Sequence, residues 1–199
     1  MTVAKKQQRS SPEILLFKDA HEFDIWLGRN QESSSGIWLK LAKKDATVRS
    51  ISYDEAIEVA LCYGWIDGQK AARDTRYWLQ RFTPRTSRSR WSQINRDKAE
   101  QLQAAGRMKA RGLAEVERAK ADGRWAAAYE GQRKATIPDD FQRALDRDRK
   151  AAMAFDELDA SNRYSMIWRI NDAKRPETRE KRIAKYLDML RRGERVHGS

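Results

Sequence analysis

The stretch from Gly64 to Asn95 constrains the fold most, because aromatic, arginine and turn residues are interleaved there more densely than anywhere else. Two strand patterns, at 65–71 and 76–82, are joined by a short turn, and Pro84 stops the second because proline cannot donate to a sheet. If that strand is regular, its two faces carry Tyr77, Leu79 and Arg81, and Trp78, Gln80 and Phe82. The stretch therefore predicts an antiparallel pair of strands.

Other segments supply the rest of a small sheet and its helices. Short apolar runs at 14–17 and 37–41 are typical of strands. Asp19 is placed to cap a helix, while Ser52 and Glu55 match a capping box that predicts a helix to about Tyr63. These patterns predict an α+β fold with a small, mainly antiparallel sheet and flanking helices.

From Ser92 onward the pattern is almost wholly helical. Helices are expected from 92 to 105 and 112 to 121, around 153–158, and after the starts at Pro138, Ser161 and Pro176. The chain is therefore divided into a flexible leader at residues 1–11, an α+β domain at 12–135 and an all-helical C-terminal unit at 136–195.

Positive charge is concentrated in one part of the chain. The sequence carries a net charge of +12, and nine Lys or Arg residues against two Asp between Gln69 and Lys98 supply +7 of it. Such a segment favours an anionic partner, which could be a small molecule, a protein or nucleic acid. The plain alternative is a solvated basic surface.

Cysteine usage and hydropathy bear on the compartment. Cys62 is the single cysteine, which excludes an intramolecular disulfide and any multi-cysteine metal site. The longest apolar run near the N-terminus, 14–17, is too short for a signal peptide, and nothing approaches the length of a membrane span. We expect a soluble cytoplasmic protein, with no cofactor and no metal.

Several ordered motifs carry a resemblance to a known family. They are YGWIDGQ (63–69), RFTPR (81–85), SRWSQIN (89–95), GRM (106–108), DGRW (122–125) and ETREKRI (177–183). With them the chain resembles the YdeI/OmpD-associated family of bacteriocin-protection proteins from about Glu13 to Arg195, and its C-terminal helices resemble that family's C-terminal domain. The resemblance implies a bacterial accessory protein in bacteriocin protection or stress response, with an envelope-protein link, and it supplies no catalytic residues.

The candidate site lies in the basic segment. The candidate anion or partner surface comprises Lys70, Arg81, Thr83, Arg85, Arg88, Ser89, Arg90, Trp91 and Asn95, with a pocket formed by Trp65, Asp67 and Trp78. Guanidinium groups bind phosphate or carboxylate in bidentate fashion, indole rings stack on bases, and helix N-termini attract anions. In the structural alternative the tryptophans pack in the core, the arginines stack on them or pair with Asp67 or Asp74, and Ser92 merely caps a helix.

Three functions remain open at this level. The first is a non-catalytic accessory protein that binds an anionic partner, and the second is sequence-nonspecific nucleic-acid binding. The third is an enzyme acting on a small anionic substrate, with Asp67 or Cys62 at the floor of a pocket. The two histidines, His21 and His197, form no metal-ligand pair, and no known catalytic motif is present.

Overall fold

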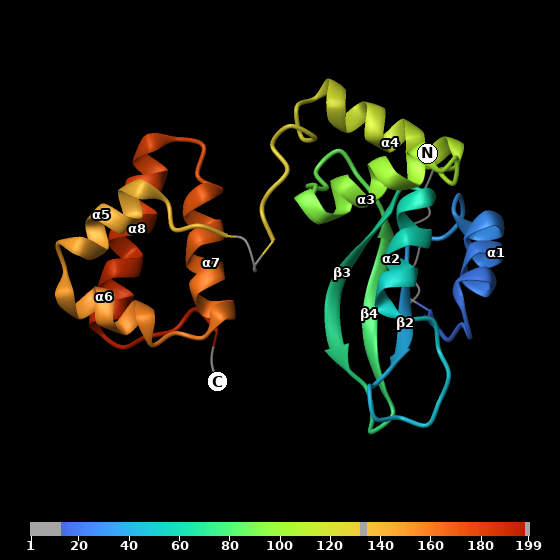
Figure 1. The fold of residues 1–199 in the computed structure, drawn as a ribbon, viewed down its shortest axis with the longest axis horizontal. Coiled ribbons are helices and arrows are strands. Elements are labelled where there is room, and N and C mark those ends of the chain that lie inside the picture. Colours follow the sequence, from blue (N-terminus) through green and yellow to red (C-terminus); the bar gives the residue numbers. More distant parts are fainter. Residues whose placement is uncertain (1–12, 132–134, 198–199) are drawn as a thin grey trace, which may run out of the picture. The chain divides into compact units, whose positions relative to one another are not determined.

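The computed structural model describes residues 13–131 and 135–197 and divides the chain into two compact units (Figure 1). The first unit ends at Tyr129 and the second begins at Glu130. The flexible leader expected at residues 1–11 lies outside the described residues. Each unit has a hydrophobic core of its own, so the fold of each unit is described by itself.

The first unit is built on a four-stranded sheet with the order β1-β2-β4-β3. Its strands are β1 (Ile14–Leu15), β2 (Ile37–Ala42), β3 (Trp65–Ala72) and β4 (Tyr77–Pro84). β1 runs parallel to β2, whereas β2 with β4 and β3 with β4 are antiparallel. The prediction of a small, mainly antiparallel sheet is confirmed, although the strand expected at 14–17 is only two residues long.

A β-bulge interrupts the pairing of β3 with β4. Asp67 stands opposite Phe82 and Lys70 opposite Gln80, so two residues of β3 face one residue of β4. The Gln80 side chain is buried, and its Nε2 donates to the carbonyls of Gly68 and Gln69 at 2.9 and 3.3 Å. Gln80 thereby supplies a hydrogen-bond donor to the backbone carbonyls of both bulge residues.

Four helices contribute to a core on one face of this sheet: α1 (Ala20–Asn30), α2 (Tyr53–Cys62), α3 (Gln93–Ala104) and α4 (Ala110–Ala121). Ile37, Leu39 and Leu41 point from β2 into this core, while Trp38 and Lys40 alternate to the other side. The predicted capping box at Ser52 is present, and α2 ends just before Gly64, which has φ +69°.

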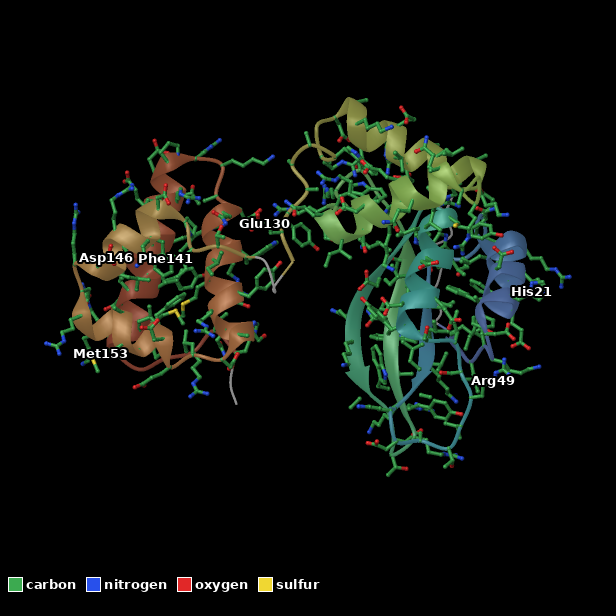
Figure 2. All side chains as sticks on the ribbon, viewed as in Figure 1. His21, Arg49, Glu130, Phe141, Asp146 and Met153 are labelled. Carbon is green, nitrogen blue, oxygen red and sulfur yellow. The ribbon has the colours of Figure 1, made fainter. Side chains whose placement is uncertain are left out.

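The second unit is a helical bundle of α5 (Asp139–Asp146), α6 (Arg149–Asp156), α7 (Ala160–Asn171) and α8 (Pro176–Arg191). Phe141 is fully buried and meets Phe155 edge to face at 5.5 Å, whereas Met153 is more than half exposed on the outer side (Figure 2). Arg179 of α8 binds both carboxylate oxygens of Asp140 and donates to the Ile170 carbonyl at 3.0 Å. The predicted all-helical C-terminal unit is confirmed.

Several helices differ in position from their predictions. α5 begins at Asp139 with Pro138 as its N-cap, and the helix expected around 153–158 is α6, at Arg149–Asp156. α4 begins at Ala110, two residues before the predicted start at Gly112. α7 is capped by Asp159, whose side chain accepts from the Asn162 amide at 2.8 Å, and Ser161 lies inside the helix. Both Asp and Ser are good N-caps, so local sequence alone did not discriminate between them.

Candidate functional site

The aromatic residues of the basic segment separate into two environments. Trp65 and Trp91 are buried in the core, and Trp91 packs against Trp125 with ring centroids 4.8 Å apart. Trp78 is partly exposed at the edge of that core. Trp65 and Trp91 therefore take the structural role that the alternative interpretation assigned to them.

Arg85 is buried, with a relative exposure of 4%. Its guanidinium carbon lies 3.5 Å from the centre of the Trp91 ring, and Nη1 donates to the Arg90 carbonyl at 3.1 Å. Burial lowers the pKa of Arg85 to about 10, so the group still carries its charge at neutral pH. Nε and Nη2 are buried and have no hydrogen-bond partner among the residues that the structure describes. Arg85 therefore holds the loop that follows β4 in place and does not form part of the molecular surface.

The loop between Arg85 and α3 is organised by hydrogen bonds of its own. The Ser89 hydroxyl accepts from the Thr86 amide at 2.9 Å, and Arg124 donates to the Ser89 carbonyl at 2.7 Å. At the start of α3 the Asn95 amide donates to the Ser92 hydroxyl at 3.2 Å, and the Gln93 amide donates to the Tyr129 carbonyl. The Ser92 hydroxyl thus caps α3, as the structural alternative expects, and both amides already have acceptors within the fold. Arg88 and Arg90 are exposed on the loop.

Asp67 lies on the helix-covered side of the sheet, near its edge. Its carboxylate accepts from the Tyr53 hydroxyl at 2.7 Å instead of pairing with Arg81 or Arg85. Burial, followed by the hydrogen bond to Asp67, raises the pKa of Tyr53. Lys70 is nearby in sequence, with its ammonium 4.3 Å from the centre of the Trp78 ring. Asp67, Lys70 and Trp78 thus lie on the covered side of the β3–β4 pair, and Trp65, at the start of β3, is buried in the core on that side.

The opposite face of the sheet gathers cations and aromatic rings. The strand register places Trp38 opposite Arg81, Lys40 opposite Leu79 and Ala42 opposite Tyr77. The guanidinium of Arg81 lies 5.9 Å from the Trp38 ring centre, and the Lys40 ammonium lies 5.7 Å from that of Tyr77. We call this surface the open face. Its strand positions are Ile14, Trp38, Lys40, Ala42, Ile66, Gly68, Ala71, Tyr77, Leu79, Arg81 and Thr83.

The open face differs in charge and packing from the covered face. No Asp or Glu occupies any of its described strand positions. Arg76 adds a third cation just before the start of β4, 5.9 Å from the Tyr77 ring centre. Trp38, Tyr77 and Leu79 are absent from the hydrophobic core cluster of the unit, which confirms that they point away from it. The open face is a platform of partly exposed rings surrounded by positive charge.

Of the predicted site residues, only Arg81 and Thr83 stand on the open face. Sequence reasoning missed Trp38, Lys40 and Tyr77 as site residues, although a usable signal was present. In the alternating strand at 37–41, the apolar set is buried, so Trp38 had to point to the other side together with Lys40. A large ring on the polar side of an alternating strand was the clue.

The residues considered for chemistry are placed as follows. Cys62 is buried at the end of α2, and burial raises the pKa of its thiol, so it is a poor nucleophile at neutral pH. His197 contacts the Ser165 hydroxyl at 2.6 Å. In the part of the chain that the structure describes, no three His, Cys, Asp or Glu side chains come together as metal ligands do. Within the same residues, no helix is long and apolar enough to cross a membrane.

Comparison with protein families gives two matches, one in each unit. Residues 15–115 match a family described as a domain of unknown function (DUF8412). Residues 134–193 match the family described as bacteriocin-protection, YdeI or OmpD-associated. No curated protein and no solved structure matches the chain significantly. The family predicted from the motifs is therefore confirmed over the C-terminal helices, while the motifs at 63–95 and 106–108 lie in the part that matches the other family.

Proposed function

The chain belongs through residues 15–115 to the family of the domain of unknown function DUF8412 and carries a C-terminal domain of the bacteriocin-protection, YdeI or OmpD-associated family, and we propose that its first unit binds single-stranded nucleic acid on the open face. The role proposed for the protein is that of a non-catalytic accessory factor. The open face gives the positively charged chain a defined binding surface for anions, which the loop at 85–91 alone does not provide.

One observation carries the proposal: Trp38 and Tyr77 are accompanied on the same face by Lys40 and Arg81, without a carboxylate among the described strand positions. Bases stack on aromatic rings and on guanidinium planes, while cations beside the rings contact the phosphates. Both chemistries are present here within one sheet. A solvated basic surface would not need two large rings on its exposed side.

The rings of the open face and their spacing favour binding of single-stranded over double-stranded nucleic acid. Stacking on a protein ring requires a base whose own face is free, and the bases of a duplex are already stacked on each other. Trp38 and Tyr77 stand four pairing positions apart on β2 and β4, which corresponds to about 13 Å along the strands. A flexible single strand can reach both rings with different bases.

The test uses fluorescence anisotropy with labelled single-stranded and double-stranded oligonucleotides of the same sequence. Replacing both rings in a Trp38→Leu, Tyr77→Leu variant keeps apolar surface but removes stacking, which is worth about 1–3 kcal/mol per base. We expect single-strand affinity to fall at least about tenfold, while thermal unfolding stays close to that of the wild type because neither ring belongs to the core.

The charge contribution is tested separately through its salt dependence. In a Lys40→Gln, Arg81→Gln variant, loss of two phosphate contacts lowers the slope of log affinity against log salt by about 1.4. The matched control is Arg29→Gln with Arg88→Gln, which removes the same net charge from exposed positions outside the open face. If only the control lowers affinity, the binding surface lies outside the open face, and the proposal is wrong.

The match of residues 134–193 supports a setting for this binding, namely an accessory role in bacteriocin protection, and we propose the cytoplasm as its location. Cells that lack the protein would then be killed at lower bacteriocin concentrations, and the wild-type chain would restore resistance. The Trp38→Leu, Tyr77→Leu variant should restore less. Equal killing with and without the protein would contradict the role in bacteriocin protection. The nucleic-acid proposal would then be judged by the binding assay alone.

A further inference from the structure

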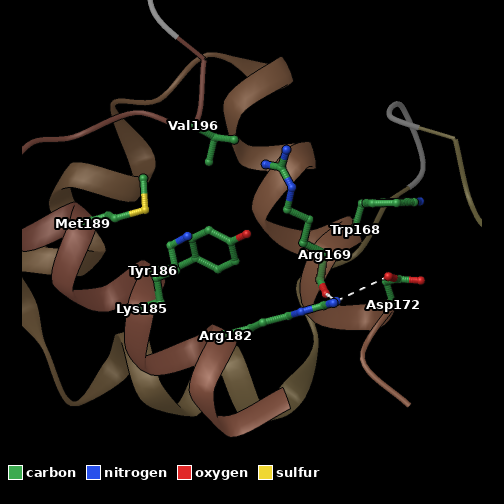
Figure 3. Close-up of a pocket in the computed structure, with 8 residues that line it drawn as sticks. All are labelled: Trp168, Arg169, Asp172, Arg182, Lys185, Tyr186, Met189 and Val196. Atoms are coloured by element: carbon green, nitrogen blue, oxygen red, sulfur yellow. Dashed lines mark hydrogen bonds and ion pairs between the residues drawn. The ribbon is translucent and has the colours of Figure 1, made fainter. Parts of the chain in front are cut away.

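A groove of about 510 Å³ lies in the second unit, between α7 and α8 (Figure 3). Trp168 comes from α7, Tyr186 and Met189 come from α8, and Val196 comes from the segment after α8. Tyr186 is buried, and the other three side chains are partly exposed. Together they form an apolar floor, of a size typical for small-molecule sites.

The C-terminal segment is held in place where it borders the groove. The buried Asn162 accepts from the His197 amide at 2.8 Å, and its side-chain nitrogen donates to Asp159 at 2.7 Å. His197 in turn contacts the Ser165 hydroxyl. Val196 is therefore fixed beside the groove by its neighbour in the chain, and the groove is a built feature of this unit.

Three cations line the groove, but they are not equivalent. Arg182 donates to the Arg169 carbonyl and lies 3.4 Å from an Asp172 carboxylate oxygen, so its charge is compensated within the fold. Arg169 and Lys185 form no ion pair with any residue in the described ranges 13–131 and 135–197. One of them comes from each helix, and both border the Tyr186 ring (Figure 3).

We propose that this groove binds a small amphipathic organic anion, with its apolar body on Tyr186 and Met189 and its acidic head group between Arg169 and Lys185. An apolar floor excludes a bare inorganic ion, which would lose hydration there without compensation. Two uncompensated cations at the rim disfavour a cationic or purely apolar ligand. The site is independent of the open face, because every lining residue belongs to the second unit.

The experiment titrates the full chain with anilinonaphthalene sulfonate, an aromatic sulfonate that fluoresces when its rings leave water. Competition then compares octanoate with octanol, which share a chain length and differ in the charge of the head group. We expect saturable binding at one site and displacement by octanoate at about tenfold lower concentration than by octanol.

Three variants locate the binding. Arg169→Gln with Lys185→Gln should weaken sulfonate binding roughly fivefold to tenfold, because both head-group contacts are lost. Met189→Trp should weaken it by a similar factor through occupation of the floor, with thermal unfolding measured to confirm that the bundle is intact. Lys150→Gln, an exposed charge on α6 outside the groove, should leave the affinity within about twofold.

The pattern of binding across these variants supports or overturns the site. Binding that is lost in both groove variants and kept in Lys150→Gln supports it. No saturable binding, equal displacement by octanol, or an equal loss in Lys150→Gln would overturn it, since the probe would then report general charge or nonspecific apolar contact. If Met189→Trp unfolds, the charge variants decide, because their side chains are not in the core.

Discussion

At the scale of single residues, Arg85 shows how a basic residue can serve the fold and not a ligand. Its guanidinium is out of water and against the Trp91 ring, and within the described part of the chain only Nη1 has a hydrogen-bond partner, the Arg90 carbonyl. Stacking on an indole and one hydrogen bond offset only part of the cost of burying a charge. The position is thus held more by packing than by charge.

This view predicts the order of two substitutions. Arg85→Ala leaves a cavity beside Trp91 and removes a loop contact, so we expect it to lower the free energy of unfolding by about 2–4 kcal/mol. Arg85→Met fills most of the space without a buried charge and should cost clearly less. Urea unfolding of both variants, with exposed Arg88→Ala as a control within about 0.5 kcal/mol of the wild type, measures this. A larger loss for Met than for Ala would show that the charge itself is required.

At the scale of elements, α4 packs closely on the end of α2. The Lys109 amide, just before α4, donates to the Cys62 carbonyl at 2.9 Å. Gly112 is buried, and a Cβ built there would lie 2.2 Å from that same carbonyl oxygen. The absence of a side chain at Gly112 is therefore what allows the two helices to approach.

A pair of glycine substitutions separates this steric effect from backbone preference. Gly112→Ala must push α4 away from α2, and we expect a loss of at least about 2–3 kcal/mol in unfolding free energy. Gly106→Ala meets no atom of the described residues within 4 Å but sits at φ +66°, so it should cost only about 1–2 kcal/mol. Thermal and urea unfolding of the two variants provide the comparison. Similar losses of unfolding free energy at both positions would mean that α4 can move away from α2 at little cost.

At the scale of the whole molecule, the chain carries two cores that share no residues. One core gathers residues from the sheet and α1 to α4, and the other gathers residues from α5 to α8. The two family matches fall on the same division, at 15–115 and 134–193. Each unit therefore has its own source of apolar stabilisation.

Two separate cores predict that the second unit folds without the first. A fragment of residues 130–199 should show helical circular dichroism and a cooperative thermal transition, because Phe141, Phe155 and Tyr186 are buried by residues of that fragment. The full chain measured under the same conditions is the reference. A fragment that melts without a cooperative transition would show that the bundle depends on the first unit.

Local patterns were sufficient for much of this architecture. The capping box at Ser52, the glycine stop at Gly64 and the alternation in β2 each depend on residues close in sequence, and each is found as predicted. The same alternation placed Tyr77, Leu79 and Arg81 together on one face of β4. The family resemblance likewise holds for the C-terminal helices.

The candidate site was less accessible to such reasoning. Residues that are neighbours in the basic segment are separated by the fold: Arg85 enters the core, Arg81 turns to the open face and Arg88 stays on a loop. Trp38 reaches Arg81 only because β2 pairs with β4 across more than forty positions of sequence.

By itself, the sequence determined which segments become helices and strands and which residues of a strand share a face, because those properties follow from backbone periodicity and capping. It also determined the positive charge of the chain. Only the tertiary structure decided which face of the sheet the helices cover, since either face of β4 offered rings and apolar groups. That choice buries Phe82 and leaves Arg81 half-buried on the opposite face, and it thereby turns Trp38, Lys40 and Tyr77 into a surface.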